Sequence, residues 1–126
     1  MSKRSFEDID EGEIYDVGSF EVDAAEIQAF ADRYDPQPIH TDAEVAADSI
    51  FDGLIASGWF TAASCMRLLV DGFFNETISM GAFGMEELWW PTPVRPGDTV
   101  SVSLEIADKR QSTSRSDRGY VEAAVT

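Results

Sequence analysis

Residues 58–71 read GWFTAASCMRLLVD, and this stretch decides the fold class. Arg67 is the one charged side chain before Asp71, so the segment is apolar nearly all round. A helix of that composition is buried on most of its sides. Gly72 follows directly and is a typical residue for the position after a helix C-terminus. We therefore expect one long, buried central helix.

The chain before this helix shows helical and strand patterns. Residues 13–20 read as a short strand, and Asp23 with Glu26 forms an acidic variant of the capping box. Apolar residues then follow at helical spacing: Ile27, Phe30, Ala31 and Tyr34. Pro36 ends that helix, because the residue before a proline is disfavoured in the α region. A second cap at 41–44 predicts a short helix through about residue 48.

The chain after the central helix reads as β-structure. Residues 77–90 form a long strand candidate, with Gly81 and Gly84 as bend sites. Further strands are expected at 99–107, where apolar and polar residues alternate, and at 120–125, with a turn at 91–98 and a polar loop at 110–119. This order predicts an α+β fold in which an antiparallel sheet wraps the central helix.

Length and charge narrow the class of protein. The 126 residues, 44% of them hydrophobic, suffice for one domain and its core. A net charge of −15 is opposite to what nucleic-acid binding or an anionic membrane surface requires. No apolar run reaches the length of a membrane span, and the N-terminus has no apolar signal region, so we expect a cytoplasmic protein. Cys65 has no disulfide partner and reads as a small buried hydrophobe.

The last quarter of the chain differs in charge from the rest. Residues 95–126 hold five acidic and five basic side chains, so the whole excess of negative charge lies before them. Arg110, Arg115 and Arg118 are therefore candidates for contacts to the phosphates of an anionic ligand. The alternative is that they balance Asp108 and Asp117 on a solvated loop.

His40 is the chain's one histidine and ends a loop expected at 35–40; Asp35 lies five residues before it, across Pro36 and Pro38. The two prolines stiffen the segment, so the carboxylate and the imidazole are held at a reproducible separation. Such a pair is the minimum for proton transfer at neutral pH. The alternative is a capping aspartate beside a histidine with a structural role. One histidine and one remote cysteine are too few for a zinc site, and no glycine-rich phosphate loop is present.

The order of several motifs resembles that of one known family. Asp35-Pro36-Gln37-Pro38-Ile39-His40, then Asp42, a glycine-containing entry at 53–58 and the phrase ELWWPTPVRPGD at 87–98 follow one another. This arrangement is similar to the MaoC-like dehydratases, relatives of the (R)-specific enoyl-CoA hydratases. The resemblance runs from about residue 10 to the end of the chain.

The resemblance implies a hot-dog fold, a sheet curled around one long helix, over a single domain at 1–126. It implies an enoyl-thioester hydratase, acting reversibly as a 3-hydroxyacyl-thioester dehydratase on an acyl-CoA, without a metal or redox cofactor. Asp35 and His40 would handle the protons, with the acid and base roles left open. The Gly58 N–H would hold the substrate carbonyl oxygen, and Ser57 would orient the site or cap the helix. The family also implies a homodimer or larger homo-oligomer.

Two departures from the family pattern keep other functions open. The family's domain usually ends with a further strand, whereas this sequence stops inside or just after the strand expected at 120–125, so we expect either a fragment or a lost last strand. In addition, Gln37 stands where many active hydratases carry asparagine. A hot-dog acyl-CoA thioesterase is one alternative, although residues 58–70 offer no carboxylate for it. A non-catalytic partner subunit that binds acyl thioesters is another. The pair Trp89-Trp90 is assigned to core packing and a subunit contact.

Overall fold

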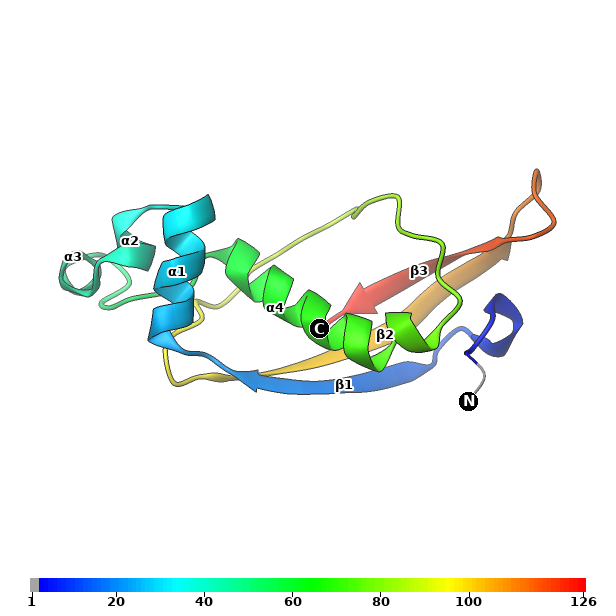
Figure 1. The fold of residues 1–126 in the computed structure, drawn as a ribbon, viewed down its shortest axis with the longest axis horizontal. Helices are drawn as coiled ribbons and strands as arrows, with labels where there is room; N and C mark the ends of the chain where they lie inside the picture. Colours follow the sequence, from blue (N-terminus) through cyan, green and yellow to red (C-terminus); the bar gives the residue numbers. More distant parts are fainter. Residues whose placement is uncertain (1–2) are drawn as a thin grey trace. The chain divides into compact units, whose positions relative to one another are not determined.

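Three strands and four α-helices make up the part of the chain that the computed structural model describes, residues 3–126 (Figure 1). The strands are β1 (Ile14–Glu21), β2 (Thr99–Gln111) and β3 (Gly119–Val125); the helices are α1 (Ala24–Tyr34), α2 (Pro38–Thr41), α3 (Ala43–Ala47) and α4 (Gly58–Gly72); and two short 3-10 turns are η1 (Phe6–Asp8) and η2 (Phe74–Glu76). The chain divides into a first unit, residues 3–19, 66–82 and 101–126, and a second unit, residues 20–65 and 83–100. That residues 1–126 form one domain stays a prediction.

The sheet has the strand order β1-β2-β3. Strands β2 and β3 pair antiparallel from Leu104 opposite Val125 to Gln111 opposite Gly119, as the hairpin in Figure 1 shows. The predicted alternation in β2 is confirmed, because Val102, Leu104 and Ile106 are buried core residues of the first unit. Strand β2 runs four residues further than expected, so the predicted loop at 110–119 begins only after Gln111.

The second half of α4 packs on β1. Gly72 faces Val17 so closely that a Cβ at Gly72 would lie 3.1 Å from the Val17 side chain. Leu69 and Phe73 are buried, and the Phe73 ring meets the Tyr15 ring edge-on at 4.9 Å. These contacts hold the second half of α4 against β1.

The sequence predicts that α4 is buried on most of its sides, and this prediction is wrong for one face. Met66 and Arg67 are exposed in the first unit, and Trp59 is exposed in the second. The physical reason in the first unit is that a sheet of three strands is too narrow to surround a helix. Cys65, expected to be buried, is only partly so, and this burial raises the pKa of its thiol.

The strand predicted at 77–90 is not formed. Thr77 makes an isolated parallel bridge with Arg4, and residues 78–98 contain no strand. Gly81 and Gly84 have φ values of +119° and +157°, which an ordinary strand residue does not adopt. No strand among residues 3–126 pairs with the segment, so its backbone lacks the ladder that would hold it extended.

The second unit is built from α1, α2 and α3 around its own core. Ile27 and Phe60 are among the buried core residues, and Phe30 packs against them. The helix predicted between the cap at Asp23 and Pro36 is confirmed as α1, which ends just before the Asp35-Pro36 step, as proline requires. The prediction of a capping box is wrong, however. Asp23 is the N-cap residue of α1, but its side chain makes no capping hydrogen bond.

His40 lies on a helix rather than on the predicted loop. Pro38 occupies the first position of α2, where its fixed φ favours a helical turn. The next helix, α3, is confirmed: the Asp42 carboxylate accepts hydrogen bonds from the N–H groups of Glu44 and Val45. The two consecutive short helices fix the backbone on both sides of the imidazole.

Candidate active site

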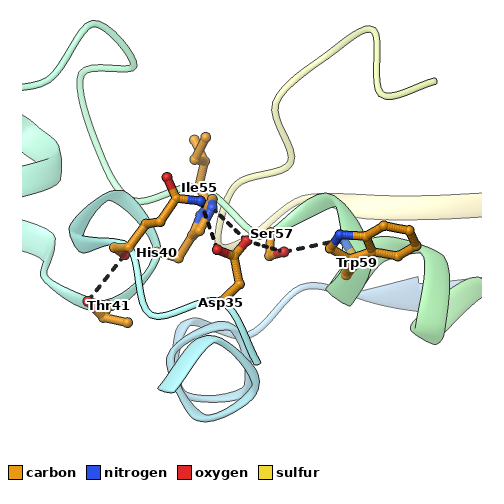
Figure 2. Close-up of polar contacts among 7 residues, drawn as sticks. Asp35, His40, Thr41, Ile55, Ser57 and Trp59 are labelled. Carbon is orange, nitrogen blue, oxygen red and sulfur yellow. Dashed lines mark hydrogen bonds and ion pairs between the residues drawn. The ribbon is translucent and has the colours of Figure 1, made fainter. Parts of the chain in front are cut away.

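The His40 imidazole is anchored in the second unit by one buried backbone carbonyl. Its Nδ1 lies 2.8 Å from the carbonyl oxygen of Ile55, and the residue is only 5% exposed (Figure 2). The Ile55 N–H in turn donates to the Ile39 carbonyl at 3.2 Å. Because a carbonyl oxygen only accepts, Nδ1 carries the hydrogen of this bond. Nε2 is therefore the nitrogen left to gain or lose a proton.

Asp35 follows α1 directly and faces Nε2. Its Oδ1 accepts a hydrogen bond from the Gln37 amide at 2.7 Å, and its Oδ2 accepts one from the Ser57 hydroxyl at 2.7 Å. These two donors, with a smaller contribution from the charge of His40, hold the pKa of the Asp35 carboxyl below its ordinary value against the opposing effect of burial. Asp35 is therefore ionised at neutral pH.

The contact between Asp35 and His40 is long for a hydrogen bond. Oδ2 and Nε2 are 3.4 Å apart, whereas a charge-assisted N–H···O bond is about 2.7–2.9 Å. Both atoms thus keep the capacity to contact a third group, and a single water can lie within hydrogen-bond distance of both. The Asp35 side chain retains 22% of its exposure, so the carboxylate is reachable from solvent.

Ser57 connects the carboxylate to the start of α4. The residue is 1% exposed, and its Oγ accepts a hydrogen bond from the Trp59 N–H at 3.3 Å while it donates to Asp35 (Figure 2). Ser57 thus contacts both Asp35 and the start of α4, and its role in a site stays a prediction. The N–H of Gly58, the first helical residue, has no hydrogen-bond partner among residues 3–126.

A cavity of about 400 Å³ lies beside these groups. His40 and Gly58 both line it, whereas Asp35 and Ser57 do not. Most of the other lining residues are apolar, including Ile39, Phe51, Ile55, Trp90 and Val94. Residues 54–57 are buried. The N–H of Ala56 donates to the Val94 carbonyl at 2.8 Å, which joins two segments that line the cavity. The arrangement places His40 and the first residue of α4, Gly58, against a largely apolar volume.

The three predicted phosphate-binding arginines lie in the first unit. The Arg110 guanidinium stacks 4.4 Å above the Tyr120 ring, and Arg115 and Arg118 both lie near Asp117, at 3.8 and 3.3 Å. The contacts with Asp117 agree with the alternative interpretation, in which these arginines balance acidic charge on a loop. Phosphate binding by these residues stays a prediction.

Three contributions to the site escaped sequence reasoning. Gln37 was noted as a departure from the family, yet it is a hydrogen-bond donor to Asp35. The Ile55 carbonyl carries no side-chain signal, so sequence could not find it. Trp90 lines the cavity and is 45% exposed, a role outside the assignment of the Trp89-Trp90 pair to core packing and a subunit contact.

Known proteins share this fold. Residues 9–126 match the family model of the MaoC like domain. The crystal structure of the MaoC-like dehydratase from Rhodospirillum rubrum is 44% identical, with a TM-score of 0.84 over 94% of this chain and 81% of that one. The (R)-hydratase from A. caviae involved in PHA biosynthesis is 25% identical, with a TM-score of 0.64 over 93% of this chain and 91% of that one. The uncharacterized protein YdeM of Bacillus subtilis (strain 168) is 34% identical over 100 residues, 79% of this chain and 70% of YdeM.

The chain therefore belongs to the MaoC-like dehydratase family and has the hot-dog fold. Family and fold confirm what the motifs at 35–42 and 87–98 predicted. Membership supports a hydratase or dehydratase in general terms. No helix within residues 3–126 combines the length and the apolar character that crossing a bilayer requires.

Proposed function

We propose that the protein is an enoyl-thioester hydratase that adds water reversibly to a 2-enoyl-CoA, and so also dehydrates the 3-hydroxyacyl thioester. One observation carries this proposal: Nε2 of His40 lies 3.4 Å from the Asp35 carboxylate, and His40 and Gly58 both line a largely apolar cavity. Water addition needs a proton acceptor for the water, a proton donor for the α-carbon and a stabilised carbonyl oxygen. The site offers one group for each need.

We assign the acceptor role to Asp35 and the donor role to His40. An ionised carboxylate is the acceptor, and His40 in its protonated form donates from Nε2. A water between Oδ2 and Nε2 gives its proton to Asp35 while its oxygen bonds to the β-carbon. The C=C electrons shift toward the carbonyl, and Nε2–H delivers a proton to the α-carbon. The proton on Asp35 then passes to Nε2, which restores the starting state; dehydration runs the same steps backwards.

Gly58 would stabilise the enolate-like oxygen that forms in this step. Its N–H is the first of α4, where the unpaired N–H groups and the helix dipole favour negative charge. A preorganised donor of this kind is worth about 10²–10³ in turnover in other enzymes. The substrate's enoyl carbons and its carbonyl would therefore lie between His40 and Gly58.

An assay with crotonyl-CoA tests the proposal against its alternatives. A hydratase removes the absorbance of the enoyl thioester and releases no thiol, whereas a thioesterase releases free CoA. The first turn of α4 has no acidic residue, so nothing in the helix favours the thioesterase. Binding without either reaction would contradict the proposal and leave the non-catalytic partner.

We further propose that Arg110, Arg115 and Arg118 contact the CoA phosphates. Replacing all three with glutamine should raise KM for crotonyl-CoA by about tenfold or more, since each hydrogen bond to a charged group adds about 1.5–3 kcal/mol. KM for crotonyl-pantetheine, which lacks the nucleotide, should not change. Arg67→Gln, which removes a 79%-exposed charge on α4, is the control and should affect neither substrate. Equal effects of the triple variant on both substrates would remove the assignment.

We also propose that the protein is a homodimer. Large apolar side chains are exposed between residues 78 and 89, including Ile78 at 64%, Met85 at 69% and Trp89 at 78%. A net charge of −15 opposes association, and salt screens that repulsion. Sedimentation velocity should therefore show a dimer whose population rises with salt. A monomer that persists at high salt and high protein concentration would contradict it.

A further inference from the structure

Trp90 sits on the first residue of α4. A Cβ built on Gly58 would lie 2.3 Å from Cδ2 of the Trp90 ring, closer than real Cβ atoms come to any neighbour. The indole therefore occupies the space that a side chain at position 58 would need. Position 58 therefore needs a glycine because of the indole, whether or not a substrate carbonyl also approaches it closely.

The ring of Trp59 also packs against the Trp90 indole. The two rings meet edge-on, with centroids 5.3 Å apart and planes at 75°. This geometry is favourable for aromatic pairs. Because Trp90 is still 45% exposed, it has one side on the protein and one toward solvent. A ring held in this way forms a defined wall and does not fill the core.

The cavity that Trp90 lines suits an acyl chain. Its polar side chains are His40, Thr61 and Thr92, and the remainder of the wall is apolar. A volume of about 400 Å³ lies near the small end of the range of about 300–1,000 Å³ that ligand pockets span. The indole is the largest side chain at its boundary.

We propose that Trp90 sets the upper size of the acyl group that this protein accepts. The proposal rests on the proposed function, in that it takes the ligand to be an acyl thioester. With the indole in place the site favours short acyl chains. Removing the indole opens the space in front of Gly58 to further methylene groups, each of which gains about fourfold in affinity when it is buried.

Binding of saturated acyl-CoAs tests this without relying on catalysis. Calorimetric affinities of wild type should increase with chain length up to a short limit and then level off. In Trp90→Ala the limit should move to longer chains, so that two added methylenes tighten binding by about fifteenfold beyond the wild-type limit. Trp90→Phe, which keeps a smaller ring, should fall between them. Trp89→Ala is the matched control, since Trp89 is 78% exposed and does not line the cavity.

The outcomes separate this inference from the proposed function. A longer limit in Trp90→Ala supports the inference, even if the crotonyl-CoA assay shows no hydration. Identical chain-length profiles in wild type, Trp90→Ala and Trp90→Phe overturn it, even if hydration is observed. Should Trp90→Ala fail to fold, as judged by circular dichroism, the comparison of wild type with Trp90→Phe decides in the same way. A shift that Trp89→Ala reproduces would also overturn the inference.

Discussion

Replacing His40 with asparagine is expected to lower hydratase turnover about 100-fold or more, the usual scale for a lost acid–base group. Asparagine is the informative choice because its amide nitrogen takes the position of Nδ1 and can still donate to the Ile55 carbonyl. The substitution thus removes Nε2 alone. Alanine would leave that buried carbonyl unpaired, which costs about 1–3 kcal/mol and confuses lost stability with lost chemistry.

Asp35→Asn is expected to reduce turnover on the same scale, since an amide cannot accept the proton of the water. Turnover of crotonyl-CoA hydration and thermal unfolding should be measured together for both variants. Asp32→Asn, a change of an exposed carboxylate on α1, is the control and should keep wild-type turnover. If either site variant folds normally and keeps full activity, the proton roles proposed for Asp35 and His40 are wrong.

The same carboxylate couples the site to the stability of the fold. The pKa of Asp35 in the folded protein lies below its unfolded value of about 3.9, because Gln37 and Ser57 donate to the ionised form. The ionised group therefore stabilises the folded state at pH values above that unfolded value. This contribution is lost as the pH falls through the lower, folded value. At low pH, protonation of Asp35 removes the ionised acceptor of the hydrogen bonds from Gln37 and Ser57.

Local patterns predicted the parts of the fold that local forces determine. Proline ended α1 next to the catalytic candidate, Asp42 capped α3, and alternation placed Leu104 and Ile106 in the core. The pairing of Asp35 with His40 was also predictable, because a short proline-stiffened span joins them. In each case the residues that decide the structure lie within a few positions of one another.

The features that sequence missed depend on partners far along the chain. The strand expected at 77–90 has suitable residues, but strand formation needs a neighbour to pair with. His40 meets a carbonyl 15 residues away, and Gly58 meets an indole 32 residues away. A carbonyl has the same chemistry at every position, so nothing in the sequence marks Ile55. Close packing of Trp90 on Gly58 likewise follows from the tertiary fold alone.

Gly58→Ala should show how strongly the start of α4 depends on Trp90. The new Cβ would lie 2.3 Å from the ring, so the indole must move, and overpacking of this kind costs about 1–3 kcal/mol. The displaced ring would also change the cavity wall beside His40. We expect kcat/KM for crotonyl-CoA to fall by about tenfold or more, because small misplacements near the reacting groups have effects of that size.

A double-mutant cycle with Trp90→Ala separates this steric effect from any effect on the N–H. Without the indole, Gly58→Ala should be neutral or stabilising, because alanine favours a helix by about 1 kcal/mol over glycine and keeps the same N–H. Urea unfolding of the four proteins measures the coupling, and their kcat/KM values show whether activity follows it. If Gly58→Ala destabilises the protein equally in both backgrounds, the contact with Trp90 is not what requires glycine at the helix start.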